Sequence, residues 1–194
     1  MSFQHVVKIP RERIGALIGK RGKVKQEIEQ KCGVKIEIDS DTGDAVISGN
    51  GSLDRMELFR AVEIVTAIAR GFSPQRASRL FEQPAEETDA IIYQLMDLRE
   101  YAGKSPNALD RIRGRIIGQG GKSRRTLEEL SGAYISVYGH SVGIIGTLRE
   151  AKLASEAVSM LAKGSMHKNV YNLLQEARRK EKLDRMRLWE DSYT

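Results

Sequence analysis

The chain has 194 residues and a mass of 21.7 kDa, and 40% of its residues are hydrophobic, which suits one or two small domains with buried cores. Its 32 Lys and Arg against 26 Asp and Glu give a net charge of +6, which permits a nucleic-acid partner without requiring one. No apolar run approaches the roughly 18 residues of a membrane span, no signal-peptide core follows Met1, and the single Cys32 excludes a disulfide framework. These features predict a cytoplasmic protein with no membrane partner.

The first 70 residues predict six elements. A strand over His5–Ile9 ends at Pro10, and two helices over 11–18 and 23–32 flank a glycine turn at 19–22. Gly33 is placed to cap the second helix. Strands over 34–38 and 45–48 follow, joined by a turn at 39–43. An amphipathic helix over 53–70 closes the module, with its apolar positions at Met56, Phe59, Ile64 and Ile68.

The next stretch differs in charge. Residues 72–101 carry three basic and six acidic side chains, whereas residues 102–164 carry ten basic and five acidic ones. An acidic stretch between two basic halves predicts a spacer, over 72–96. Within it we expect two helices, over Pro74–Glu82 and Glu86–Met96.

The second half repeats the order of the first. We expect its first strand over Asp97–Gly103, then Ser105 as the cap of a helix that Pro106 opens and Ile116 ends. A glycine turn at 118–121, a helix over 122–130, strands over 134–138 and 142–145, and a helix over 148–163 complete the module. A long charged helix over His167–Trp189 follows, and its apolar positions are expected to dock on a domain: Val170, Leu173, Leu174 and Ala177.

An internal repeat connects the halves. The stretch Ile18 to Lys23 recurs as Ile117 to Lys122, an offset of 99 residues. The same offset maps Gly15 onto Gly114, Gly33 onto Gly132 and Ile36 onto Ile135. Two copies are too few for a solenoid. The sequence therefore predicts two similar domains over 1–71 and 97–164, joined by the helical spacer 72–96 and followed by a C-terminal helix over 165–194.

Each repeat places basic residues around a Gly-x-x-Gly turn between two helices. Glycine has no Cβ, so a phosphate can approach the backbone, and the next helix directs its free N–H groups to the same place. The predicted cations beside the turns are Arg11, Arg13, Lys20, Arg21 and Lys23 in the first copy, and Arg113, Arg115, Lys122, Arg124 and Arg125 in the second. Ile14, Ile18, Ile36 and Ile117 either line a groove for bases or belong to the core, and both interpretations stay open.

Ile18-Gly19-Lys20-Arg21-Gly22-Lys23-Val24 resembles the signature of KH domains, and the element order is similar to their eukaryotic form, type I. The resemblance implies an α+β fold of two tandem KH domains, each with a three-stranded sheet and helices on one face. It also implies single-stranded RNA held across the two turns, with contacts at Gly19, Lys20, Arg21, Gly22 and Lys23 and at Gly118, Gln119, Gly120, Gly121 and Lys122. Gln119 stands where the related proteins usually have lysine, which weakens the expected phosphate contact there.

The second repeat, over Gly114–Ser123 and on through Ile145-Gly146 and 168–172, is similar to a narrower family. This family is the small-subunit ribosome assembly factor that partners the Nob endonuclease in eukaryotes, together with its archaeal homologues. The resemblance implies binding to the 3′ end of precursor small-subunit ribosomal RNA. Implied partners are a Nob-type endonuclease, a ribosomal RNA dimethyltransferase and the alpha subunit of translation initiation factor two.

Other functions fit the sequence less well. Gly120-Gly121-Lys122-Ser123 resembles the end of a phosphate-binding Walker loop, but Ile116 stands where its first glycine should be. His5, His140 and His167 are dispersed, so we expect no metal, cofactor or catalytic residue. Two alternatives keep the KH fold: a regulator of translation initiation or RNA decay, and a protein-interaction platform with a degenerate second domain.

Overall fold

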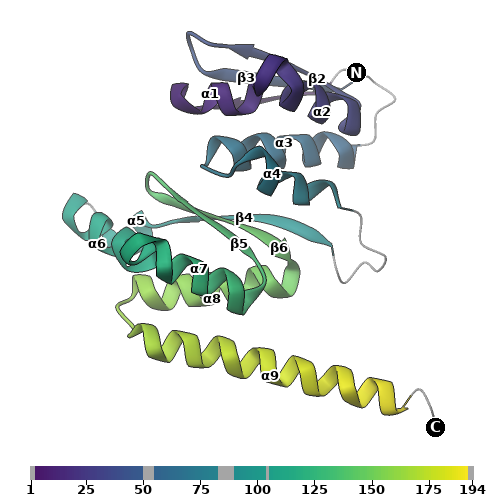
Figure 1. The fold of residues 1–194 in the computed structure, drawn as a ribbon. Helices are drawn as coiled ribbons and strands as arrows, with labels where there is room; N and C mark the ends of the chain where they lie inside the picture. Colours follow the sequence, from purple (N-terminus) through teal and green to yellow (C-terminus); the bar gives the residue numbers. More distant parts are fainter. Residues whose placement is uncertain (1–2, 50–54, 83–89, 104, 192–194) are drawn as a thin grey trace. The chain divides into compact units, whose positions relative to one another are not determined.

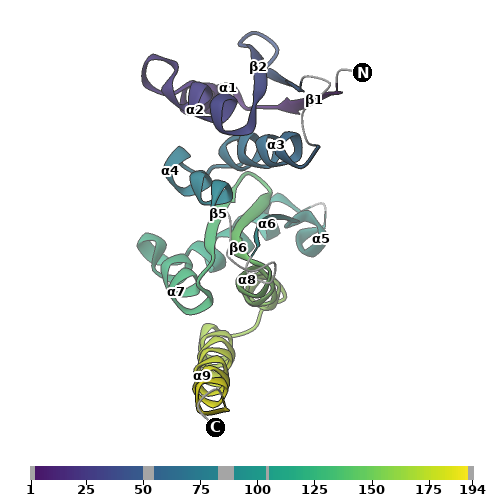
Figure 2. The same ribbon diagram turned by 90° about the vertical axis from the view of Figure 1, so that its right-hand side faces the viewer.

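In the computed structural model, which describes residues 3–49, 55–82, 90–103 and 105–191, the chain forms two compact units, Met1–Gln94 and Leu95–Thr194. Figures 1 and 2 show the helices and strands of each unit from two directions. None of the described helices is both long and apolar enough to cross a membrane.

The first unit follows the predicted order. Strand β1 (Phe3–Lys8) leads to helix α1 (Arg11–Ile18), the 3₁₀ turn η1 (Lys20–Gly22) and helix α2 (Lys23–Cys32). Strands β2 (Val34–Asp39) and β3 (Asp44–Gly49) and helix α3 (Arg55–Ala69) follow. The start predicted for α3, at residue 53, lies outside the described residues. Gly33 has the left-handed conformation that its predicted role as a helix cap requires.

The first sheet has the order β1-β3-β2, with antiparallel pairs. Its inner face carries Val7, Ile36, Ala45 and Ile47, which are buried under the three helices. On α3, Ile64 and Ile68 are buried as predicted, whereas Met56 and Phe59 are exposed. The prediction that all four face the core is therefore wrong for this pair, because Leu58 and Ala61 occupy the inward positions of that helical turn instead.

A short helical segment closes the first unit. Helix α4 (Pro74–Ala77) and the 3₁₀ turn η2 (Ser78–Phe81) occupy the stretch where a helix was predicted. Ser73 caps α4 by accepting a hydrogen bond from the Arg76 amide. Ala77 and Leu80 are buried, so this segment packs as part of a core.

The second unit differs from prediction at its start. Strand β4 (Ile91–Asp97) occupies most of the stretch predicted as a helix over Glu86–Met96, and residues 86–89 lie outside the described residues. The strand predicted over Asp97–Gly103 is wrong as well, because helix α5 (Arg99–Ala102) forms there. Along β4 no alternation of buried and exposed side chains marks the strand, so its sequence lacks the period of two that identifies one.

The remaining elements agree with prediction to within a few residues. They are α6 (Pro106–Ile117), the 3₁₀ turn η4 (Gln119–Gly121), α7 (Lys122–Ser131), β5 (Tyr134–Tyr138), β6 (Ser141–Thr147), α8 (Leu148–Ala162) and α9 (His167–Asp191). The sheet order is β4-β6-β5, and α6, α7 and α8 lie on one side of it (Figure 1). Helix α9 packs along α7 and α8 through Val170 and Leu174, two of the four predicted docking positions that are fully buried.

Candidate nucleic-acid interface

The first glycine turn connects the end of α1 to the start of α2. Gly19 has φ +72°, and a Cβ built on it would lie 2.4 Å from Val24 Cγ2 and 3.0 Å from the Val24 amide nitrogen. Gly22 has φ +76° but nearly open space around it. Gly19 is therefore required both by its φ and by the close approach of α2, and Gly22 by its φ alone.

The second turn has the same geometry. Gly118 has φ +71°, and a Cβ there would lie 2.6 Å from Ser123 Cβ and 2.8 Å from the Ser123 amide nitrogen. Gly120 and Gly121 also have positive φ, with nothing within 4 Å of an added Cβ. In both turns the glycines leave backbone uncovered at the start of the following helix, where free N–H groups attract an anion.

The two turns differ in charge and in strain. Arg21, at the tip of the first turn, is the one non-glycine residue with positive φ among the described residues, at +55°, and Gly120 takes its place in the second turn. Lys20, Arg21 and Lys23 are all exposed, and none of them pairs with a described carboxylate. The first turn thus presents three cations to solvent.

The second turn presents fewer cations than predicted. Lys122 is exposed, and Gln119 beside it is neutral. Arg125 Nη2 donates to the Gly120 carbonyl at 3.0 Å, so this guanidinium braces its own turn. Arg124 Nη1 donates to Glu128 Oε1 at 3.2 Å and to the Ile135 carbonyl at 3.3 Å, which directs it away from the turn.

Four other predicted arginines have partners within the fold. Arg13 donates through Nε to the Ile68 carbonyl at 2.9 Å and through Nη2 to the Phe72 carbonyl. Arg115 does the same in the second unit, through Nε to the Leu161 carbonyl at 3.2 Å and through Nη2 to the Ser165 carbonyl. Both therefore clamp the end of the last KH helix, a structural role. Arg11 donates to the Asp41 carbonyl, and Arg113 donates to Asp110.

The predicted isoleucines separate into core and surface. Ile14 and Ile36 are buried, with exposed fractions of 7% and 0%, so they belong to the core. Ile18 and Ile117, each in the last turn of the helix before a glycine turn, are half-buried. These two are the apolar side chains left to contact a base beside the turns.

Sequence reasoning missed a carboxylate that is repeated in both units. Glu29 Oε1 accepts a hydrogen bond from the Ile36 amide at 2.8 Å, and Glu128 Oε1 accepts one from the Ile135 amide at 2.7 Å. Each glutamate also pairs with a basic residue four positions earlier, Lys25 at 3.6 Å and Arg124 at 3.2 Å. The offset of 99 residues relates all these positions, which is the sequence signal that could have revealed them.

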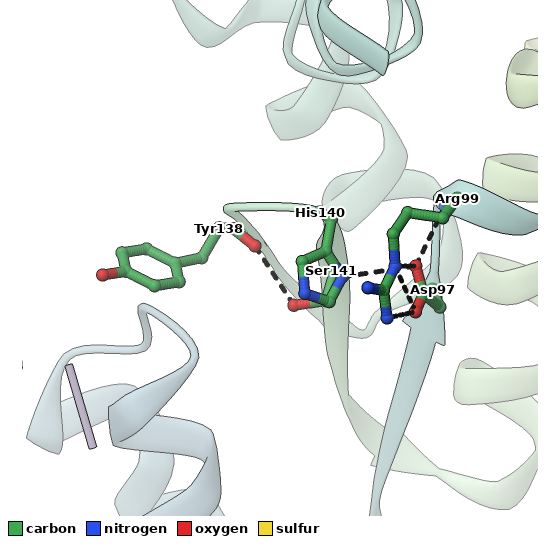
Figure 3. Close-up of polar contacts among 5 residues, drawn as sticks. All are labelled: Asp97, Arg99, Tyr138, His140 and Ser141. Atoms are coloured by element: carbon green, nitrogen blue, oxygen red, sulfur yellow. Dashed lines mark hydrogen bonds and ion pairs between the residues drawn. The ribbon is translucent and has the colours of Figure 1, made fainter. Parts of the chain in front are cut away.

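The tip of the β5–β6 hairpin is tied to the end of β4 (Figure 3). Asp97 Oδ1 accepts from the Arg99 amide at 2.9 Å and lies 3.2 Å from His140 Nδ1, while Ser141 Oγ donates to the Tyr138 carbonyl. The hydrogen bonds from Arg99 hold the pKa of Asp97 well below its ordinary value. The Leu98 amide also donates to the His140 carbonyl at 2.8 Å. The cluster thus stabilises the hairpin.

Sites of other kinds are not formed by the described residues. Among them, no group of three His, Cys, Asp or Glu side chains is placed to hold a metal ion. Burial raises the pKa of the Cys32 thiol to about 11, far above that of a reactive thiolate. The features that the two units share are the glycine turns and their surroundings.

Comparisons with protein families support this assignment of the fold. Residues 92–179 match the model of the second domain of PNO1, described as a eukaryotic-type KH domain (KH-domain type I), and residues 4–57 match the KH domain. The match over 92–179 begins in β4, so it includes the strand that the sequence pattern did not predict.

Relatives and solved structures extend the likeness to the whole chain. A KH domain-containing protein of Methanocaldococcus jannaschii is 41% identical over 95% of this chain and 78% of its own length. The structure of Dim2p from Pyrococcus horikoshii is 42% identical with a TM-score of 0.80, covering 90% of this chain and 99% of that one. Dim2p in a complex with a/eIF2alpha and rRNA, from the same organism, is 42% identical with a TM-score of 0.81, covering 93% and 96%.

Eukaryotic relatives are more distant and longer. The pre-rRNA-processing protein PNO1 of Chaetomium thermophilum is 30% identical over 60% of this chain, which corresponds to 44% of the relative's length. This chain therefore spans about half the length of the eukaryotic proteins that it matches.

Proposed function

Because the chain belongs to the Dim2/PNO1 family of tandem KH-domain proteins, we propose that it binds single-stranded ribosomal RNA during assembly of the small ribosomal subunit. The observation that carries the proposal is the duplicated glycine turn, with open backbone at a helix N-terminus and exposed cations beside it. The P. horikoshii complex adds support, since it combines rRNA and a/eIF2alpha with a protein 42% identical to this one. The proposed RNA segment is the 3′ end of the small-subunit RNA.

The proposed contacts are narrower than the full set predicted from the sequence. We retain Gly19, Lys20, Arg21, Gly22 and Lys23 with Ile18, and Gly118, Gln119, Gly120, Gly121 and Lys122 with Ile117. We assign Arg13, Arg115 and Arg124 to the fold, because their guanidinium groups hold backbone carbonyls. The larger electrostatic share falls to the first turn. The role is binding without catalysis, in the cytoplasm.

Charge reversal in the first turn tests the proposal. Replacing Lys20 and Arg21 with Asp is expected to weaken binding of a single-stranded RNA strongly. It should also shallow the dependence of log K on log salt, by about 0.7 for each phosphate that the variant no longer neutralises. Affinity is measured by fluorescence anisotropy over a range of salt concentrations.

The matched control reverses two exposed lysines elsewhere, Lys152 on α8 and Lys163 after it, with the same change in net charge. An unchanged salt slope in the Lys20 and Arg21 variant would remove the first turn from the proposed contacts. Replacing Gln119 and Gly120 with Asp tests the second turn. If RNA binding persists in that variant, the second turn has another partner.

Crosslinking in cells tests the identity of the RNA. Sequencing of the bound RNA is expected to show enrichment at the 3′ end of the small-subunit ribosomal RNA. Enrichment scattered over messenger RNAs would instead favour the alternative function, a regulator of RNA decay or translation.

A further inference from the structure

The strand beside each glycine turn is an edge strand, and a side chain already occupies part of its edge. Strand β2 is last in the order β1-β3-β2, and β5 is last in the order β4-β6-β5. Edge strands leave every second N–H and C=O without a strand partner. At Ile36 and Ile135 the outward amide donates instead to Glu29 and Glu128, from α2 and α7.

The two units differ at the carbonyl of the same residue. In the second unit Arg124 bonds both Glu128 and the Ile135 carbonyl, so the amide and the carbonyl at this position are both occupied. In the first unit Lys25 pairs with Glu29 at 3.6 Å, and no described side chain donates to the Ile36 carbonyl. The forked guanidinium reaches two acceptors where a single ammonium reaches one.

This position lies within reach of an RNA held at the turn. Glu29 is six residues beyond Lys23, so it lies roughly 9 Å along α2 from the glycine turn. Its side chain is 22% exposed and that of Lys25 34% exposed. A base attached to a phosphate at the turn would extend toward this edge. There it would meet a carbonyl acceptor in the first unit and an occupied edge in the second.

We propose that Lys25 and Arg124 determine base selection in the two units. With lysine, the first unit offers the Ile36 carbonyl and the Glu29 carboxylate to a base that carries an amino group. Adenine, cytosine and guanine carry one, whereas uracil presents carbonyl oxygens that these acceptors repel. With arginine, the second unit offers no such acceptor and does not discriminate at the corresponding position. This proposal rests on the RNA-binding function proposed above.

A reciprocal exchange tests the assignment without changing charge. The full chain and its variants Lys25→Arg, Arg124→Lys and the double exchange are each incubated with a pool of randomised single-stranded RNA decamers. The bound RNA is sequenced, and the affinity for the whole pool is measured separately. Lys31→Arg and Arg149→Lys serve as controls, since they make the same changes in ion pairs away from the two edges.

In the wild-type chain we expect one position at which uracil is depleted. Lys25→Arg should remove this depletion, a change of about fivefold, as expected for one hydrogen bond. Arg124→Lys should create a second depleted position, and affinity for the pool should change little. Unchanged base frequencies, with or without a uniform loss of affinity, would overturn base selection by these residues while leaving RNA binding intact. If the wild-type chain binds no pool RNA, the proposed function itself fails.

Discussion

At the scale of single residues, each position of the glycine turns has its own physical requirement. Gly19 and Gly118 carry both a positive φ and a neighbour within 3 Å of an added Cβ, whereas Gly121 carries the positive φ alone. Arg21 tolerates the left-handed conformation in the first turn, at a cost of roughly 1 kcal/mol. A cation at the tip of the turn is worth this cost if it meets phosphate, which fits the RNA contact proposed for it.

Replacing Gly118 with Ala is expected to destabilise the chain by about 2–4 kcal/mol. The new Cβ would meet the Ser123 backbone in a strained left-handed conformation. Replacing Gly114 with Ala is the matched control, because this helical position has open space and should gain about 0.5–1 kcal/mol from lower backbone entropy in the unfolded state. Urea unfolding measures both. Equal stability of the two variants would contradict the steric argument.

At the scale of elements, the sequence predicted most helices and strands because their apolar spacing or their caps are local. Ser105 does accept a hydrogen bond from the Ala108 amide at the start of α6, as predicted. Strand β4 was missed because Ile91 to Met96 show no alternation of polar and apolar residues. The acidic residues before it suggested a helix start instead.

The roles of the arginines could not be predicted, because their partners are distant in the chain. Arg13 bonds a carbonyl 55 residues away, and Arg115 one 46 residues away. Arg13 and Arg115 also occupy different positions of the repeat, since the offset of 99 maps Arg13 onto Ile112. The two units thus make the same clamp from neighbouring turns of equivalent helices, and alignment of the repeats hides it.

Replacing Arg115 with Met is expected to destabilise the second unit by about 1–3 kcal/mol. It leaves the carbonyls of Leu161 and Ser165 without their donor. The salt dependence of RNA binding should stay as in the wild type, because this guanidinium belongs to the fold. Arg111→Met is the control, since Arg111 is exposed and bonds only a carbonyl in its own helix. A shallower salt slope in the Arg115 variant would return this residue to the RNA interface.

At the scale of the whole molecule, the repeated unit is longer than a KH domain. After the last KH helix, each unit adds a helical segment that packs on it, α4 with η2 in the first unit and α9 in the second. Lys31, near the end of α2, places its ammonium 4.4 Å from the centre of the Phe81 ring, and Arg178 of α9 donates to the Glu129 carbonyl near the end of α7. We therefore propose to extend the first domain from residue 71 to about residue 82.

Replacing Leu80 with Ala tests this extension. Leu80 is 2% exposed, so its truncation should lower the free energy of unfolding by about 2–5 kcal/mol. Gln75→Ala, at an exposed position of α4, is the control and should change stability by less than about 0.5 kcal/mol. Thermal and urea unfolding of the full chain measure both. Equal effects would mean that residues 74–81 are a linker.

The glutamates on the edge strands also bear on solubility. An edge strand with bare amides is a template to which another chain can add a strand, the first step of edge-to-edge aggregation. Glu29 and Glu128 remove the central outward donor of β2 and β5 from that role. Their charge further repels a second backbone carbonyl that approaches the same amide. A protein whose sheets must stay open to RNA along one edge thereby stays closed to other protein strands there.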